Sequence, residues 1–348
     1  MREPGLLFIG NYLVSPKTNK NVWHHLAERL KNRGWRIITT SDRSFPPFRL
    51  LDMVWTIFFH QNQYRLCEID VFSGRAFFWA EICSFLLKIM NKPMILVLHG
   101  GKLPHFACQH PIRVAKVFKR ATIIVSPSPY QQTQFVNIRS DIRVIPNPID
   151  LNQFTFSHRI EPKPKLIWVR AFHDIYSPTI VPEVIKGLIS KFPDISLCMI
   201  GPDKGDGSLQ RMLSVSENLG VQDCIKICGR APHESIPDLL NQSDIFINTS
   251  EIDNFPSSVL EAMANGLCIV STNVGGLPWL IDDEENGLLV PPNDPAAMAQ
   301  AVGRILTEPD LSNKLSKNAR QKAEMFSWPL ILSQWEALFW EVINSTNV

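Results

Sequence analysis

The sequence predicts an α/β protein of two Rossmann-like, doubly wound domains, and three observations carry this prediction. The chain has 348 residues, which is more than one ordinary hydrophobic core supports. Short apolar runs alternate with amphipathic stretches from end to end, as in βα units around a parallel sheet. Hydrophobic residues make up 45% and charged residues 20%, which is typical of a folded globular protein.

Twelve apolar runs are expected to form strands, six in each half of the chain. Those of the first half are 6–10, 36–40, 67–72, 94–100, 122–127 and 142–147. Those of the second half are 165–170, 196–201, 224–229, 245–250, 268–273 and 288–292. Because parallel strands bind ligands beyond their carboxyl ends, the cleft between the two domains is the expected place for a site.

Helices are expected between the strands and at the end of the chain. Residues 19–34 are amphipathic and end at Gly34, a helix stop. Residues 76–90 are strongly apolar, but Glu81 and Lys88 interrupt them and they fall short of the ~20 residues of a membrane span. A buried helix is therefore favoured there over an interfacial one. Three further helices are expected at 294–307, 310–325 and 328–345.

The domain boundary is expected in the segment 148–166, where two prolines among charged residues interrupt regular structure. We predict an N-terminal acceptor domain over 1–155 and a C-terminal donor domain over 156–326. A final helix over 327–348 is expected to pack back toward the N-terminal domain.

Charge and cysteine usage bound the partners and the compartment. Residues 1–160 contain 21 Lys and Arg against 9 Asp and Glu, and the remainder contains 14 against 24. The basic half suggests an anionic partner, a membrane surface or a charged substrate, although a solvated basic surface gives the same count. No nucleic-acid-binding motif is present, so nucleic acid is not expected. The seven scattered cysteines without a C-x-x-C pair, and the lack of a signal-peptide pattern, indicate reduced core thiols and a cytoplasmic protein.

The most informative stretch is 250–266, which reads SEIDNFPSSVLEAMANG. It is a loop at the carboxyl end of a strand, followed by a helix that Gly266 closes. Pro256 suits the start of that helix, and Ser257 or Ser258 can cap its first turn. The remaining N–H groups and the positive end of the helix dipole would then suit an anion such as diphosphate.

Two acids flank this helix start. Asp253 lies in the loop, and Glu261 lies one turn into the helix, from where it could reach polar ligand groups beyond the phosphates. Ionised carboxylates accept hydrogen bonds only, which matches the vicinal hydroxyls of sugars. The alternative at this point is a surface-loop acid and an ordinary helical acid.

The pattern of an acid, seven residues, an acid, AMANG and VSTNVGG resembles the donor segment of retaining glycosyltransferases of family 4. That family has the GT-B fold, in which two Rossmann-like domains face each other across a cleft. The resemblance covers the whole chain and is strongest over 142–302. Further agreements are 98-LHGG-101, 142-IRVIPNPID-150, 168-WVR-170, 200-IGPDKGDG-207, 227-ICGR-230 and 270–302.

The resemblance implies roles for individual residues. Arg170 would grip the diphosphate, Asp253 would touch the donor sugar, and His99 would face that sugar, so these three are the expected catalytic residues. Glu261 would hold the ribose hydroxyls. The other expected donor-binding residues are Asn254, Phe255, Pro256, Ser257, Ser258, Gly201, Lys204, Gly229 and Arg230, with Gly275 and Gly276 lining the cleft. On the acceptor side the resemblance implies Gly10, Asn11, Gly100 and Gly101.

The sequence departs from the family pattern at three places. Asp253 stands where most relatives have Glu. The lysine that usually follows Arg170 by about five residues is missing, and Lys204, His173 or Tyr176 could compensate for it. The first loop, 10–21, has one glycine and two lysines instead of a glycine-rich sequence, so it is expected to be shaped for a particular acceptor.

The expected reaction is retaining transfer of a sugar from a nucleotide-diphosphate sugar to an acceptor hydroxyl, in polysaccharide or glycoconjugate assembly. No cofactor is expected, and no metal, since no D-x-D pair occurs. The acceptor would be a sugar or a lipid-linked sugar, and the enzyme would work at the inner membrane face. A nucleotide-sugar epimerase and a catalytically weak nucleotide-sugar-binding protein stay open as alternatives. A nicotinamide oxidoreductase is disfavoured, because no G-x-G-x-x-G follows the first strand.

Overall fold

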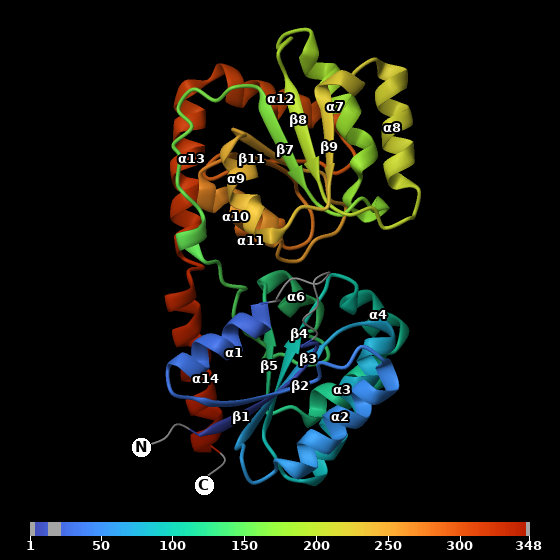
Figure 1. The fold of residues 1–348 in the computed structure, drawn as a ribbon, viewed down its shortest axis with the longest axis vertical. Coiled ribbons are helices and arrows are strands. Elements are labelled where there is room, and N and C mark those ends of the chain that lie inside the picture. Colours follow the sequence, from blue (N-terminus) through green and yellow to red (C-terminus); the bar gives the residue numbers. More distant parts are fainter. Residues whose placement is uncertain (1–3, 13–21, 346–348) are drawn as a thin grey trace. The chain divides into compact units, whose positions relative to one another are not determined.

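The computed structural model describes residues 4–12 and 22–345 and divides into two compact units (Figure 1). Unit 1 comprises Met1–Pro148 and Pro329–Val348, and unit 2 comprises Ile149–Trp328. The division falls after Pro148, earlier than the expected boundary at 155. The expected helix over 19–34 begins outside the described residues and is seen as α1, Val22–Asn32.

Unit 1 is built on a six-stranded parallel sheet with the order β2-β1-β3-β4-β5-β6. Because β3 lies beside β1, the chain reverses its direction of winding between these two strands. The strands are β1 Gly5–Ile9, β2 Arg36–Thr40, β3 Leu66–Val71, β4 Met94–Leu98, β5 Ile123–Ser126 and β6 Arg143–Val144. The helices are α1, α2 Pro46–Phe59, α3 Phe77–Ile89, α4 Leu103–Gln109, α5 Pro111–Arg120, α6 Pro129–Gln134 and α14 Trp328–Ser345.

Unit 2 repeats the architecture with the order β12-β11-β10-β7-β8-β9, the strand order of dinucleotide-binding folds. The winding reverses between β7 and β10. The strands are β7 Lys165–Val169, β8 Ser196–Ile200, β9 Ile225–Gly229, β10 Ile245–Asn248, β11 Cys268–Thr272 and β12 Leu288–Val290. The helices are α7 Val181–Ile189, α8 Ser208–Leu219, α9 Ile236–Asn241, α10 Ser257–Asn265, α11 Leu277–Leu280, α12 Pro295–Thr307 and α13 Pro309–Glu324.

The expected fold class is confirmed, and each of the twelve expected strands is present. The central strands are continuous apolar runs because helices cover both faces of a parallel sheet, and β1, β4, β10 and β11 are buried along their whole length. The expected strand 142–147 is shorter than predicted. Only Arg143–Val144 pair, since Pro146 and Pro148 cannot donate to a strand ladder.

The segment that was expected to join the domains is packed on unit 2. It contains only a short 3-10 helix, Leu151–Gln153, but Arg159 within it is 4% exposed. The Arg159 guanidinium donates to the carbonyls of Asn265 at 2.6 Å and Ser243 at 3.0 Å. These bonds make the segment an ordered part of unit 2.

Helix α14 packs against the strands and helices of unit 1. The rings of Trp335 and Trp23 lie 5.5 Å apart, and those of Phe339 and Phe8 lie 6.1 Å apart. Glu341 forms an ion pair with Arg143 at 2.5 Å. The last helix of the chain therefore belongs to the core of the first domain.

Two predictions about side-chain burial are only half right. Helix α3 is buried along one face, as expected for 76–90, but its other face exposes Phe78, Phe85 and Ile89. The expectation that the cysteines are core residues is wrong for Cys108, which is exposed. Among the described residues, no helix is both long and apolar enough to cross a membrane.

Candidate functional site

In unit 2, charged and polar side chains gather where β7 and β10 end, at the point where the winding of the sheet reverses. Arg170 follows β7, Asn248 ends β10, and Asp253 lies in the loop after β10. The gap between the carboxyl ends of such strands is the usual ligand position in doubly wound sheets.

Arg170 and Asp253 form an ion pair at this point. Nη2 of Arg170 lies 2.5 Å from Oδ2 of Asp253, and the two side chains are 13% and 14% exposed. Nε of Arg170 donates to Oδ1 of Asn248 at 3.5 Å, and the Tyr176 ring lies 5.2 Å from the guanidinium carbon. Nη1 has no hydrogen-bond partner among the described residues. The guanidinium is thus held rigidly and keeps a donor for a ligand.

The structure distinguishes the three residues that could replace the missing lysine. Tyr176 packs on the Arg170 guanidinium, and burial raises the pKa of its hydroxyl. His173 instead accepts a hydrogen bond from the backbone of Ile175 at 3.1 Å, and Lys204 is exposed. Tyr176 is therefore the one that is joined to the arginine, as a ring against its face rather than as a second cation.

Three glycines allow the loops of this site to pass close to one another. A Cβ on Gly201 would lie 1.7 Å from the carbonyl oxygen of Arg170. A Cβ on Gly275 or Gly276 would lie 1.9 Å from the Asp253 carbonyl oxygen or 1.7 Å from that of Asn254. The Gly276 N–H also donates to the Asp253 carbonyl at 2.9 Å. These glycines therefore do more than form turns: they let neighbouring loops pack against the backbone of the loop that carries Asp253.

The expectation that a serine caps α10 is wrong. Pro256 itself is the N-cap, with φ −73° and ψ 114°, and no side chain caps the helix. Ser257 and Ser258 lie inside the first turn, where their hydroxyls cannot reach back to the first amides. The Ser258 hydroxyl is buried without a hydrogen-bond partner among the described residues. The start of α10 therefore combines an uncapped helix end with an unsatisfied hydroxyl.

Glu261 lies one turn into α10, as predicted, and is held by a histidine that sequence reasoning missed. Its Oε1 lies 3.2 Å from Nε2 of His233, and the Glu261 side chain is 12% exposed. The hydrogen bond to Glu261 is the main cause that raises the pKa of His233 above its ordinary value of 6.5. His233 follows β9, so its place after a strand's carboxyl end was the available signal.

The other expected donor-binding residues have mixed surroundings. The carbonyl of Gly229 accepts from the Gly201 amide at 2.8 Å, so the ends of β8 and β9 meet. Phe255 packs edge-to-face on Phe326, with ring centroids 5.3 Å apart, and contributes to the core. Asn254 is buried, and its backbone N–H donates to Asp253 at 2.9 Å. Arg230 and Lys204 are exposed.

In unit 1, His99 follows β4 and is fixed by a carboxylate that was not predicted. Its Nε2 lies 2.6 Å from Oδ1 of Asp70, which is 2% exposed at the end of β3. The His99 ring stacks on Phe72 at 4.7 Å and meets the edge of Trp23 at 5.2 Å. After it, Gly100 adopts φ +76°, and its carbonyl accepts from Gln131 at 3.1 Å.

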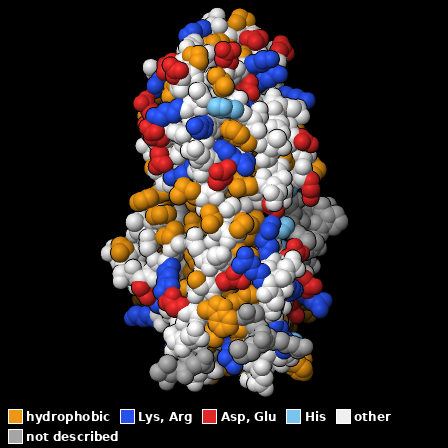
Figure 2. Space-filling model, turned by 90° about the vertical axis from the view of Figure 1, so that its left-hand side faces the viewer, with side chains coloured by type: hydrophobic (Ala, Val, Ile, Leu, Met, Phe, Trp, Pro, Cys, Tyr) orange, Lys and Arg blue, Asp and Glu red, His pale blue; other side chains and the backbone are white. Residues whose placement is uncertain are grey.

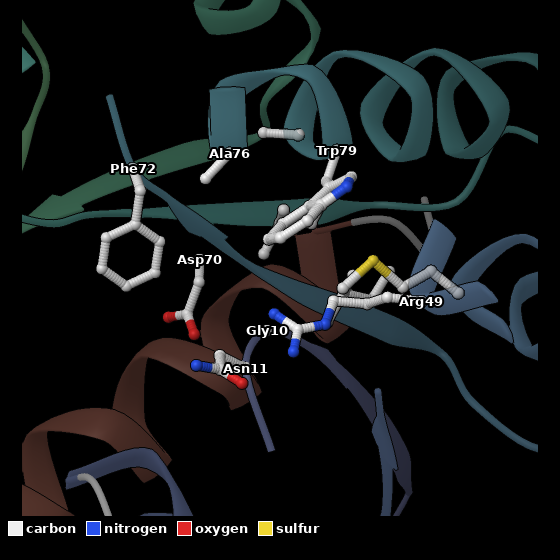
Figure 3. Close-up of a pocket in the computed structure, with 11 residues that line it drawn as sticks. Gly10, Asn11, Arg49, Asp70, Phe72, Ala76 and Trp79 are labelled. Atoms are coloured by element: carbon white, nitrogen blue, oxygen red, sulfur yellow. The ribbon is translucent and has the colours of Figure 1, made fainter. Parts of the chain in front are cut away.

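A pocket of about 240 Å³ opens beside Asp70, at the carboxyl ends of β1 and β3 (Figure 3). Gly10 and Asn11, both expected on the acceptor side, line it. A Cβ on Gly10 would lie 2.1 Å from Oδ2 of Asp70, so glycine is needed there. Gly101 follows in the turn after Gly100, and the two lysines of the expected acceptor loop fall outside the described residues. The complete lining is Ile9, Gly10, Asn11, Arg49, Met53, Ile69, Asp70, Phe72, Ala76, Trp79 and Ala80.

Glu68 lies two residues before Asp70 on β3 and is 1% exposed. Neither of its carboxyl oxygens has a hydrogen-bond partner among the described residues. Burial, and to a lesser degree the nearby Asp70 charge, raise the pKa of Glu68 well above its ordinary value. Within the described parts of the chain, no group of three or more His, Cys, Asp and Glu side chains could hold a metal ion.

Comparison with known proteins assigns the family. Residues 151–322 match the family model of glycosyl transferases group 1. A D-inositol 3-phosphate glycosyltransferase of Corynebacterium jeikeium is 30% identical over 203 residues, 54% of this chain and 48% of that protein. An N-acetyl-alpha-D-glucosaminyl L-malate synthase of Bacillus anthracis is 24% identical over 361 residues and 92% of each chain. The chain spans about half the length, or less, of the matched inositol phosphate glycosyltransferases.

Solved structures agree on the fold. Sucrose-phosphate synthase of Thermosynechococcus elongatus is similar with a TM-score of 0.79 at 18% identity, over 99% of this chain and 100% of that one. Anabaena HepE, in complex with UDP and glucose, is similar with a TM-score of 0.76 at 18% identity, over 97% and 100%. The donor-segment motif, the family model and the two parallel sheets agree: residues 151–322 belong to the glycosyl transferases group 1 family, and the chain has the GT-B fold.

Proposed function

We propose that this protein is a retaining glycosyltransferase that moves a sugar from a nucleotide-diphosphate sugar to an acceptor hydroxyl. One observation carries the proposal: a mostly buried arginine, 13% exposed, and a helix N-terminus without a side-chain cap both lie at the winding reversal of unit 2. Both Arg170 and the first turn of α10 offer N–H donors and positive charge. Such a pair suits a diphosphate leaving group.

The remaining donor contacts follow from the chemistry of each side chain. Glu261, already oriented by His233, would accept from the ribose hydroxyls. Asp253 would accept from a donor-sugar hydroxyl while still paired with Arg170. His99 would bind a further sugar hydroxyl, and its bond to Asp70 fixes the ring for this. Asp253 is shorter than glutamate, so its choice of sugar hydroxyl is expected to differ from that of relatives.

The proposed reaction breaks the bond between the anomeric carbon and the diphosphate oxygen and forms a bond from that carbon to the acceptor oxygen on the same face of the sugar. The acceptor proton moves to the departing diphosphate, so no separate base is required. Arg170 and the amides at the start of α10 stabilise the charge that builds on the leaving group. No metal ion takes part in this scheme.

The test measures release of UDP or GDP and incorporation of sugar into an acceptor. Thermal shift with a panel of nucleotide sugars identifies the donor first, since a ligand that binds the native state raises the melting temperature. Acceptor-dependent release that is lost in Arg170→Ala and Glu261→Gln supports the proposal. Nucleotide release with an altered free sugar and no incorporation indicates an epimerase, and tight binding without turnover indicates a binding protein; either outcome contradicts the transferase.

We further propose that the protein works in the cytoplasm against an anionic membrane surface, on a lipid-linked sugar acceptor in polysaccharide or glycoconjugate assembly. Helix α2 supports this, because the aromatic residues Phe48, Trp55 and Phe59 are 61%, 61% and 65% exposed along one stripe. The surrounding half of the chain is basic, with 21 Lys and Arg against 9 Asp and Glu over 1–160. By contrast, Lys314 and Lys322 of α13 in unit 2 pair with Glu285 and Asp282 of the segment after α11. Figure 2 shows Lys, Arg, Asp and Glu side chains intermingled over the upper part of the view.

Vesicle co-sedimentation tests the membrane proposal. The expected result is binding to phosphatidylcholine vesicles that contain phosphatidylglycerol, and binding weakened at least about tenfold by Trp55→Glu with Phe59→Glu. Leu213→Glu, at an exposed position of α8 in unit 2, is the matched control and should bind normally. Binding that ignores the phosphatidylglycerol content, or that survives the double substitution, contradicts the proposal.

A further inference from the structure

Arg49 of helix α2 is buried without a compensating negative charge. It is 6% exposed, and its Nε donates to the carbonyl oxygen of Arg43 at 2.8 Å. The Trp79 ring lies 5.0 Å from its guanidinium carbon. No carboxylate of the described residues lies within ion-pair distance, and neither terminal nitrogen has a hydrogen-bond partner among them. Figure 3 shows this guanidinium pointing across the pocket of unit 1 toward Gly10 and Asn11.

A second buried arginine shows what a structural arginine looks like in the same chain. Arg159 is 4% exposed, but it pairs with Asp244 at 3.4 Å and donates to the carbonyls of Asn265 and Ser243. Burying a charge without such partners is costly. Burial alone also lowers the pKa of Arg49 from its ordinary value. The Arg49 guanidinium would therefore be stabilised by a negatively charged partner, and a ligand in the pocket can supply that charge.

The other walls of the pocket indicate what accompanies the negative group. Asp70 and the Asn11 side chain offer hydrogen-bond acceptors and an amide suited to hydroxyls, while Trp79 and Phe72 offer flat apolar faces. The volume of about 240 Å³ is smaller than the roughly 300–1,000 Å³ of sites for drug-sized molecules. The pocket thus suits one small polyhydroxyl unit rather than an extended chain.

We propose that this pocket binds the acceptor, and that the acceptor is a polyol or sugar bearing a phosphate group, which pairs with Arg49. The planar guanidinium matches a phosphate in two parallel hydrogen bonds, and Trp79 holds it in that plane. Asp70 and Asn11 bind the hydroxyls, with Gly10 leaving room beside Asp70. That this ligand is the acceptor rests on the proposed function, whereas the binding of a phosphate-bearing polyol does not.

Calorimetric titration of the whole protein, without nucleotide, tests the inference. The probes are inorganic phosphate, glycerol 3-phosphate, dihexanoyl phosphatidic acid as a lipid-borne phosphate, and glycerol as the neutral control. Arg49→Met should weaken binding of the phosphate probes by roughly 10- to 100-fold, and Arg49→Lys by less, because charge-assisted bonds are lost. Arg43→Met is the matched control, since its side chain is 65% exposed and its carbonyl is kept; it should bind normally. A preference between glycerol 3-phosphate and the lipid tells a free from a lipid-borne phosphate.

The melting temperature separates a ligand-binding arginine from a structural one. If Arg49 serves to bind a ligand, its uncompensated charge destabilises the protein when the pocket is empty. Arg49→Met should then melt at the same temperature as wild type or higher. A lower melting temperature together with unchanged phosphate binding overturns the inference, as does equal binding of glycerol and glycerol 3-phosphate by wild type. Transferase activity is measured in a separate experiment. If the protein binds the phosphate probes through Arg49 but shows no sugar transfer, the proposed function is rejected and this inference stands.

Discussion

The two units place an arginine near the same point of their sheets but treat its charge in opposite ways. In unit 2, Arg170 is paired with Asp253 at 2.5 Å, and Glu261 is paired with His233 at 3.2 Å. In unit 1, Arg49 and Glu68 are buried, and among the described residues neither has an oppositely charged partner. An internal partner offsets part of the cost of burying a charge, whereas Arg49 has no such partner and gains from an anionic ligand. Glu68 avoids that cost differently, because burial raises its pKa and favours the neutral carboxyl. The same fold thus prepares one site by internal pairing and the other by an unmet charge.

The largest expected effect comes from breaking the pair of unit 2. Arg170→Ala should lower the rate of sugar transfer by roughly 10²- to 10³-fold, because it removes a charge aimed at the leaving diphosphate. It also leaves Asp253 only 14% exposed and without its cation, so the melting temperature should fall. Steady-state transfer rates and thermal unfolding measure the two effects.

The double variant Arg170→Ala with Asp253→Asn is the control for this experiment. Removing both charges should recover much of the lost stability without recovering activity. Recovery of transfer in the double variant would place the role of Arg170 in folding, contrary to the proposed chemistry.

The next largest effect is the loss of stability when a methyl group is added to a glycine of each site. Gly276→Ala puts a Cβ about where the Asn254 carbonyl lies, 1.7 Å away, and should destabilise the protein by roughly 1–3 kcal/mol or more. Gly100→Ala, in unit 1, meets nothing within 4 Å and suffers only from its φ of +76°, so about 1 kcal/mol is expected. Urea unfolding of the two variants gives the comparison, and equal losses would mean that the loops of unit 2 relax around the added atom.

Sequence alone predicted most of what backbone geometry decides. The alternation of apolar runs predicted all twelve strands, including the one that ends beside Arg170. The role of Arg170 itself was implied by the resemblance to family 4 glycosyltransferases. Gly266 was expected to end α10, and it does, with φ +81°. These features depend on residues close together in sequence, so local patterns carry them.

Pairings between distant residues could not be predicted in this way. His233 and Glu261 are 28 positions apart, and Asp70 and His99 are 29 apart, so only the folded sheet brings them together. Arg49 comes from a helix that has no sequence motif, and its lack of a partner is visible only once burial is known. The serine cap failed for a local reason, since Pro256 occupies the N-cap and moves both serines into the helix.

The buried acid of unit 1 should make stability depend on pH. Glu68 has a pKa raised by burial, so its protonated form is favoured in the folded state. The contribution of Glu68 to folding stability is fully present below its ordinary pKa of 4.5 and is lost as the pH rises through its raised pKa in the folded state. The glutamine of Glu68→Gln stays neutral at every pH. The free energy of unfolding of this variant should therefore exceed that of wild type by about 1–3 kcal/mol at pH 8 and by much less at pH 4. Urea unfolding at both pH values measures this, and a gain that is equal at the two would contradict it.

The smallest expected effect tests the paired acid of unit 2. The bond to Glu261 raises the pKa of His233 above 6.5, so this contribution to stability is present below pH 6.5 and is lost as pH rises through the higher folded value. Because His233 is 46% exposed, solvent screens the pair, and only a small shift of melting temperature across that range is expected. His233→Asn should remove the shift while leaving Glu261 able to bind ribose, so nucleotide affinity should change little between pH 6 and 8. If His233→Asn weakens nucleotide binding as much as Glu261→Gln does, the histidine itself contacts the donor, and the carboxylate is not the sole ribose ligand of this pair.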